Sequence, residues 1–408
     1  MLLDWISLFI RWFHVIAGVA WIGASFYFVW LDNNLDTPPD WKKKKGIKGD
    51  LWAVHGGGFY EVAKYEYGPE VIPQKLHWFK WEAYTTWISG FLLLSLVYYH
   101  GAAIYLIDTS VMDLTPGEAI ARGLALIFGG LFIYEAACRS PLGRYPKAFG
   151  LMFLILLAAV SYLATHWFSG RGAFIHVGAL IGTIMAGNVF FKIMPAQRLM
   201  VDAVTNKTEI DPSWGLGAKL RSVHNNYLTL PLLFIMISNH YAMTYQHEQA
   251  WLVLMAIGLV SAWIRHYFNL KHIGISRPSI LVSGAIGMFA IAYWVSMPAT
   301  VAVAPQPTTL EEQAIAAVQA EPKVLNPDQQ AVFDVMQVHC ANCHSAAPTD
   351  DIFVIAPLGV KYDTWDEIES KAALIHQRAV VTKDMPLMNR TGMTEEERQV
   401  IARWFANK

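Results

Sequence analysis

The residues best suited to redox chemistry lie near the end of the sequence, in the stretch VFDVMQVHCANCHSAAP at 332–348. Cys340, Cys343 and His344 form C-x-x-C-H, the spacing at which two thioether bonds and one imidazole hold a c-type haem. A single helical turn brings the two sulfur atoms and the imidazole to one porphyrin. The sequence therefore predicts one covalent haem c with His344 as an iron ligand.

A second iron ligand is expected before the last helix, where KDMPLMNRTGMT offers Met385, Met388 and Met393. Met385 precedes a proline on an extended stretch, a position similar to that of the axial ligand in small cytochromes c. Met393 adjoins Thr394, which forms a predicted capping box with Glu397, so we expect Met393 to pack in the core. Met385 is the predicted ligand.

The rest of the chain is too apolar for a soluble protein. Of its 408 residues, 54% are hydrophobic and 15% are charged, and the net charge of -1 gives no basic surface for nucleic acid. Cys138 has no intrachain partner once the haem motif is assigned, and we interpret it as an inert thiol. Eight apolar runs are long enough to span a bilayer: 5–31, 78–99, 119–138, 148–167, 172–194, 224–241, 249–268 and 279–298.

The distribution of Lys and Arg among the loops predicts the orientation of these spans. The loop after the first span contains KKKK at 42–45, and the loops after the third, fifth and seventh spans are also basic. The loops after the second and sixth spans contain no Lys or Arg. We therefore expect a multi-pass protein of the bacterial inner membrane with both termini in the periplasm, where haem c is attached.

The predicted fold class is all-α: a polytopic bundle of eight membrane helices in two four-helix repeats, followed by a small class I-like cytochrome c domain. The membrane domain covers 1–298 and the cytochrome domain covers 326–408. Between them, 299–325 is rich in Ala, Pro, Gln and Glu and is predicted to be a linker.

Membrane histidines could hold a second haem. FHVIAGVAWIGASFYF aligns without gaps on IHVGALIGTIMAGNVF and equates His14 with His176. If the two repeats are related by an axis along the membrane normal, these imidazoles face each other at equal depth and bind one haem b. His240 and His166 are the substitutes. Small residues with one His per helix also describe a tight helix interface, so that reading stays open.

A different set of polar residues is predicted near the cytoplasmic ends of the spans. It comprises His77, Lys80, Glu82, Arg221, His224, Asn225, Asn226, Arg265 and His266. Such donors and acceptors suit a flat polar anion, although interfacial anchoring and pairing between helices explain them equally well. HGGGFY at 55–60 lies in a cytoplasmic loop, where its glycines either approach a ligand or form a turn.

Long stretches of the chain resemble the membrane-bound bacterial urate hydroxylases (urate oxidases) with a C-terminal cytochrome c, the PuuD type. The resemblance rests on WAVHGGGFYEVAKY, LHWFKWEAYTTWISGF, IHVGALIGTIMAGNVFFKIMP, HNNYLTLPLLFIMISNHY and CANCH. It implies oxidation of urate to 5-hydroxyisourate in purine breakdown, with electrons passed through cytochrome c to a respiratory-chain acceptor.

With urate as the implied substrate, the polar residues near the cytoplasmic ends of the spans can be given catalytic and substrate-binding roles. Glu82, His224 and Arg265 are the expected catalytic residues, and His77, Asn225, Asn226 and His266 are expected to bind substrate. Three other functions stay open: a quinol-to-cytochrome c conduit without urate chemistry, a terminal oxidase, which would need clustered histidines for copper, and a urate transporter with an electron-carrying sensor domain.

Overall fold

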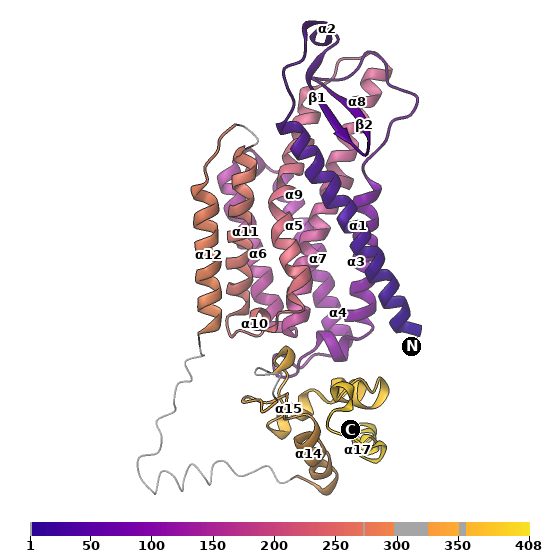
Figure 1. Cartoon of the computed structure of the whole chain (residues 1–408), viewed down its shortest axis with the longest axis vertical. Coiled ribbons are helices and arrows are strands. Elements are labelled where there is room, and N and C mark those ends of the chain that lie inside the picture. Colours follow the sequence, from indigo (N-terminus) through magenta and orange to yellow (C-terminus); the bar gives the residue numbers. More distant parts are fainter. Residues whose placement is uncertain (1, 272–273, 298–324, 351–355) are drawn as a thin grey trace. The chain divides into compact units, whose positions relative to one another are not determined.

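The structure is a computed structural model that describes residues 2–271, 274–297, 325–350 and 356–408 (Figure 1). The chain divides into two compact units. The first comprises Met1–Ile107, Leu114–Asn239 and Gln249–Ile291, and the second comprises Asp108–Asp113, His240–Glu248 and Ala292–Lys408. The predicted linker at 299–325 lies outside the described residues, apart from Leu325.

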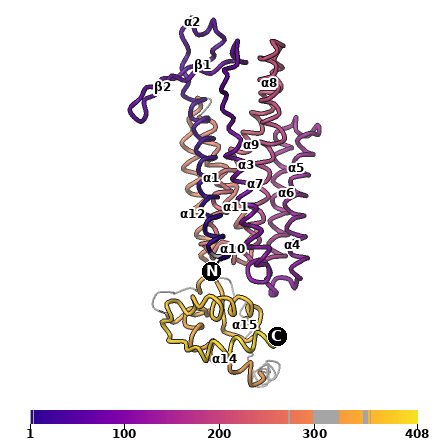
Figure 2. Tube along the Cα trace, turned by 90° about the vertical axis from the view of Figure 1, so that its right-hand side faces the viewer, coloured from indigo at the N-terminus to yellow at the C-terminus, as the bar shows by residue number. Residues whose placement is uncertain are grey.

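Long apolar helices run side by side in the first unit (Figures 1 and 2). Six helical segments of the described chain are long and apolar enough to cross a membrane. They are α1 (Leu2–Asn33), α4 and α5 (Pro116–Leu124, Gly130–Arg139), α6 (Pro146–Trp167), α7 and α8 (Gly170–Asn188, Met194–Thr205), α11 (Ala250–Lys271) and α12 (Ser279–Ser296). The π segments Ala125–Gly129 and Val189–Ile193 join the halves of the two split helices.

The two other predicted spans are helical as well. The run at 78–99 corresponds to α3 (Trp81–Leu93) and the π segment Leu94–Tyr99, and the run at 224–241 lies mostly in α9 (Pro212–Ser238). Neither is among the six segments above. The first half of α9 carries Arg221, His224 and two asparagines, which reduce its apolar character. The count of eight membrane helices therefore stays a prediction.

The loop after α1 contains a β-hairpin, which the predicted all-α class omits. Strand β1 (Ile47–His55) pairs antiparallel with β2 (Gly58–Tyr65). Gly56 and Gly57 form the connecting turn with φ of 57° and 82°, in the left-handed region that favours glycine. The HGGG stretch is thus a hairpin turn. The short helix α2 (Asp40–Lys43) is tied to both strands by the buried Lys42, which pairs with Asp50 and Glu61.

The C-terminal part of the second unit is a small helical fold with its own core. It consists of α14 (Pro327–His339), α15 (Trp365–Ser370), α16 (Ala372–Ile375) and α17 (Glu395–Ala406), with a π segment at His376–Val381. Val332, Met336, Ile368 and Ile401 are fully buried in its core. The predicted capping box of α17 is present, since Glu397 N donates to Thr394 Oγ1 and Thr394 N donates to Glu397.

Candidate functional site

The C-x-x-C-H residues form one turn at the end of α14. The carbonyl of Cys340 accepts hydrogen bonds from the backbone N–H groups of Cys343 (3.2 Å) and His344 (2.9 Å). His344 Nδ1 donates to Val360 O (2.9 Å), so Nε2 is the ring nitrogen left to bind a metal. Burial lowers the pKa of His344, which favours the neutral imidazole that ligates metals. Two thiols and one oriented imidazole are a donor set that fits haem c.

The three candidate methionines differ in burial. Met393 is 3% exposed and packs in the core, as predicted from its place beside the cap. Met388 is 82% exposed. Met385 is half-buried, and its carbonyl accepts a hydrogen bond from the buried Arg398 (2.9 Å). Its position therefore suits a ligand better than the other two positions do.

His14 and His176 have different neighbours in the first unit. His14 Nδ1 lies 3.1 Å from Thr86 O and 3.0 Å from Ser89 Oγ, and its ring packs against Gly90, where an added Cβ would be 2.9 Å from the imidazole. His176 is fully buried, and its Nδ1 donates to Gly172 O (2.7 Å).

The ring of His176 packs at another level of the bundle. Its centroid lies 5.7 Å from that of Tyr99, and an added Cβ on Gly123 would be 2.5 Å from Nε2. Gly90 and Tyr99 are nine residues apart on the same continuous helix, which corresponds to about 13 Å along its axis. The predicted equal depth of His14 and His176 is thus not found, and the residues do not fit one haem b shared by both. The substitutes His166 and His240 are exposed.

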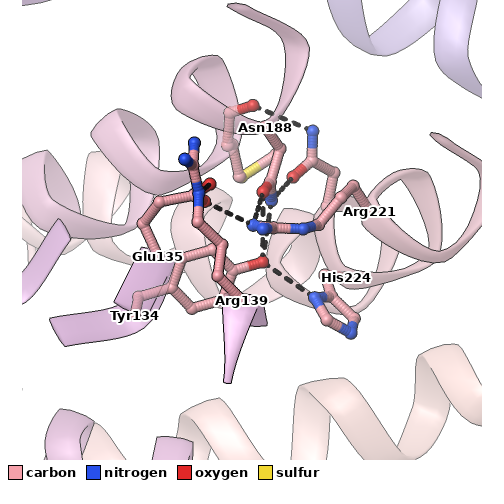
Figure 3. Close-up of polar contacts among 8 residues, drawn as sticks. Tyr134, Glu135, Arg139, Asn188, Arg221 and His224 are labelled. Atoms are coloured by element: carbon pink, nitrogen blue, oxygen red, sulfur yellow. Dashed lines mark hydrogen bonds and ion pairs between the residues drawn. The ribbon is translucent and has the colours of Figure 1, made fainter. Parts of the chain in front are cut away.

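Some of the polar residues predicted near the cytoplasmic ends of the spans form a buried polar network between α5, α7 and α9 (Figure 3). Arg221 is 6% exposed; its Nη1 lies 2.8 Å from Glu135 Oε2 and donates to Asn188 Oδ1 (2.7 Å). Glu135 also pairs with Arg139 (2.7 Å), whose side chain is 68% exposed. The carboxylate of Glu135 thereby joins one buried and one exposed guanidinium.

Asn188 connects the other members of this network. Its Nδ2 donates to Tyr134 Oη (3.0 Å) and to Asn225 Oδ1 (2.8 Å). Tyr134 Oη lies 2.7 Å from His224 Nδ1, and the imidazole stacks on Phe149 with the ring centroids 5.1 Å apart. His224 and Asn225 are therefore held by protein partners. We interpret this network as a polar connection between helices.

Asn226 points to a different helix from its neighbour Asn225. Its Oδ1 accepts a hydrogen bond from Arg265 Nε on α11 (2.6 Å). Arg265 is 7% exposed, and its guanidinium lies over the ring of Phe26, 4.5 Å from the centroid. Its Nη2 is buried, and the described residues supply no acceptor for it. A buried cation with an unused donor is suited to a planar anion.

The remaining predicted residues lie elsewhere. His266 Nδ1 is 2.7 Å from Tyr227 Oη, and its ring stacks on that of Trp263. His77 Nε2 is 3.7 Å from Glu82 Oε1, and Glu82 Oε2 is buried without a donor among the described residues. The contacts found in the described chain do not join these residues to the networks of Arg221 or Arg265. The single predicted pocket is therefore divided among several places.

Sequence reasoning did not single out Tyr134, Glu135 and Asn188. The available signal was a polar residue inside an apolar span, as in LFIYEAAC and IMAGNVFF, which in a membrane indicates a function or a buried partner. Among the described residues, no group of three or more His, Cys, Asp or Glu side chains is placed to hold a metal ion.

One comparison with known families gives a match. The model of the family described as Urate oxidase N-terminal matches residues 1–296, a range that includes the whole of the first unit. Neither a curated protein nor a solved structure matches the chain.

Proposed function

Because the chain belongs to the urate oxidase N-terminal family, we propose that it oxidises urate to 5-hydroxyisourate and passes the electrons to a haem c on its C-terminal unit. Family membership supports an oxidoreductase that acts on urate. The apolar helices support a membrane location. The C-x-x-C-H turn supports the covalent haem, and a respiratory-chain component would then accept the electrons.

The observation that carries the substrate assignment is the environment of Arg265. Urate at neutral pH is a flat anion rich in hydrogen-bond acceptors. Arg265 offers a buried positive charge with an unused Nη2, and Asn226 fixes its orientation through Nε. An aromatic ring, Phe26, covers the guanidinium. A buried charge without an anionic partner is costly, so a bound anion would complete this site.

The proposed reaction has a simple balance. Written for the uncharged molecules, urate and one water give 5-hydroxyisourate, two electrons and two protons, and the new C–O bond takes its oxygen from water. When bound, haem c would supply a one-electron acceptor, so the two electrons would leave urate in two successive one-electron steps. Cys340 and Cys343 would be its attachment points, and His344 and Met385 its ligands. Arg265 and Asn226 hold and orient the substrate.

The general base for the attacking water is proposed to be Glu82. Its Oε2 is buried and has no donor among the described residues, so this oxygen can accept a proton. His224 is less suited to the role, because Tyr134 occupies Nδ1 and the ring is stacked on Phe149. A haem b in the membrane domain stays part of the proposal, as a carrier of electrons between the substrate site and haem c. His14 and His176 would not ligate it as a pair, since their imidazoles lie at different levels.

The proposed location is the bacterial inner membrane, with both termini and the haem c in the periplasm. The positive-inside distribution of Lys and Arg supports this orientation. The hairpin, α2 and α8 lie at the same end of the bundle in both views, and that end carries the KKKK run (Figures 1 and 2). Arg265, near the C-terminal end of α11, would then receive urate from the cytoplasmic side.

An anaerobic titration of the purified full-length protein tests the proposal. Urate donates two electrons and each chain has one haem motif, so half an equivalent of urate per haem should complete the reduction of the c-haem absorption bands. The product should be detected as 5-hydroxyisourate. Reduction by a quinol but not by urate would overturn the proposal in favour of the quinol conduit.

Variants locate the substrate site. Arg265→Ala and Asn226→Ala should each slow haem reduction by urate about tenfold to a hundredfold, because a buried polar partner is left unpaired. Reduction by dithionite should be unchanged in both. Wild-type rates of reduction by urate in both variants would show that urate binds elsewhere.

A further inference from the structure

Two buried donors without acceptors lie one turn apart on α11. Arg265 Nη2 and Asn269 Nδ2 are both inaccessible, and the described residues supply neither with a hydrogen-bond acceptor. Residues four apart on a helix lie on the same face, about 6 Å apart along the axis. Buried polar atoms of native proteins are almost always paired, so two such donors together point to a missing acceptor.

The partners of Arg265 limit where that acceptor can lie. Its Nε side is engaged by Asn226 from α9, and Phe26 from α1 covers the guanidinium. The ring of Phe268 lies 5.9 Å from the same group. The guanidinium thus has protein contacts at Nε and with two rings, and Nη2 is its buried donor without an acceptor among the described residues.

The contrast with the network around Asn188 strengthens this reading. Both groups combine a buried arginine with asparagines, and both use α9. Around Asn188, however, the arginine has a carboxylate partner, Glu135, and none of the buried side-chain atoms of Tyr134, Glu135, Asn188, Arg221 and Asn225 lacks a partner within the described chain. Near Arg265 no carboxylate pairs with the cation among the described residues. The missing partner of Arg265 is thus expected to be both an acceptor and an anion.

We propose that Asn269 is a specificity-determining residue, whose amide donates to a second acceptor of the same planar anion that Arg265 binds. This inference rests on the proposed function for the identity of the anion, an oxopurine. Urate presents several exocyclic oxygens and ring nitrogens around its edge, so one molecule can satisfy two donors of one helix face. A purine without the second acceptor would leave the Asn269 amide buried and unpaired, and binding sites reject such analogues strongly.

Two substitutions separate this role from a structural one. Asn269→Leu removes the donor and leaves a side chain of similar size, and Asn269→Asp replaces the donor by an acceptor that repels an anion. Asn206→Asp is the matched control, because it makes the same chemical change at an exposed residue that follows α8. Binding is measured by anaerobic equilibrium dialysis of labelled urate against full-length protein reduced with dithionite, which cannot oxidise the ligand.

The expected result is a dissociation constant for urate raised about tenfold to a hundredfold in Asn269→Leu and raised further in Asn269→Asp. Asn206→Asp should bind urate as the wild type does. Wild-type binding in both Asn269 variants would overturn the inference, since a water molecule or the protein itself would then satisfy the amide.

The outcome for the proposed function is read separately. If the wild type binds urate and Asn269 matters, but urate does not reduce the haem, the oxidation proposal fails and the binding site stands. If urate reduces the haem and the Asn269 variants bind it normally, the proposed function stands and this inference fails. A wild type that neither binds urate nor is reduced by it would overturn both.

Discussion

The carboxylate of Glu135 offers a controlled test of how burial sets the value of an ion pair. It contacts Arg221 Nη1 at 2.8 Å and Arg139 Nε at 2.7 Å, so the two distances are nearly equal. The side chain of Arg221 is 7% exposed and that of Arg139 is 68% exposed. The two arginines thus differ in solvent access, and Arg221 also donates a hydrogen bond to Asn188. Replacing each in turn by Met should give very different losses of stability.

The magnitudes follow from the contacts. Arg221→Met removes the buried partner of Glu135 and the donor to Asn188 Oδ1, and breaking a buried pair in this way costs about 3–5 kcal/mol. Arg139→Met removes an exposed partner that solvent screens, for which about 0.2–1 kcal/mol is typical. At about 2 °C per kcal/mol for a unit of this size, the melting temperature should fall by about 6–10 °C for Arg221→Met. For Arg139→Met the fall should be about 2 °C or less.

Thermal unfolding of the detergent-solubilised full-length protein, followed by tryptophan fluorescence, measures both shifts. The double variant Arg221→Met with Glu135→Gln should be more stable than the sum of the single losses predicts, because the unpaired charge is removed with its partner. Equal shifts for Arg221→Met and Arg139→Met would refute the reasoning, as would additive losses in the double variant.

Two predictions concern the C-terminal unit. Met385→Ala should abolish the thioether-to-iron charge-transfer band of the haem, whereas Met388→Ala, at the exposed methionine, should retain it. Both variants should keep the covalent haem. Loss of the band in Met388→Ala alone would reverse the assignment. The backbone N–H of Thr394 and the side chain of His339 lower the pKa of Glu397 from 4.5 to about 2, so its contribution to stability is complete above pH 4.5 and is lost as the pH falls toward 2. Glu397→Gln should therefore flatten the acid-unfolding curve in that window, measured by tryptophan fluorescence. The control Glu396→Gln, at an exposed residue, should leave the curve unchanged. An unchanged curve for Glu397→Gln as well would contradict this linkage.

Local signals in the sequence were enough to predict much of the helical structure. Apolar runs of about 20 residues predicted the six membrane-length segments, because length and composition alone decide whether a helix can span a bilayer. The capping box at Thr394 and the burial of Met393 were confirmed, because both depend on residues close together in the chain. The hairpin was missed, although two glycines between β-rich segments are a recognised signal for a two-residue turn.

Side-chain direction and the relative depth of residues on different helices were much harder to predict than the helices themselves. Asn225 and Asn226 were correctly placed on one helix, but adjacent helical residues point about 100° apart, so one binds Asn188 on α7 and the other binds Arg265 on α11. The sequence repeat likewise matched His14 to His176 as though their two helices had the same position along the membrane normal. Their contacts at Gly90 and Tyr99 show that the offsets differ. Such offsets are set by tertiary packing, which a single sequence does not contain.

The structure supplies a criterion that the sequence lacks for separating structural from ligand-binding polarity in a membrane. Burying polar groups in an apolar medium is costly, so a polar group kept for stability should have its partners within the protein. The network around Asn188 meets this condition, since Arg221 is neutralised by Glu135 and the amides pair with each other. Arg265 and Asn269 do not meet it within the described residues. Their unpaired donors lower the stability of the protein unless a bound ligand accepts hydrogen bonds from them. For this reason the substrate site is assigned to α11 and not to the larger network around Asn188.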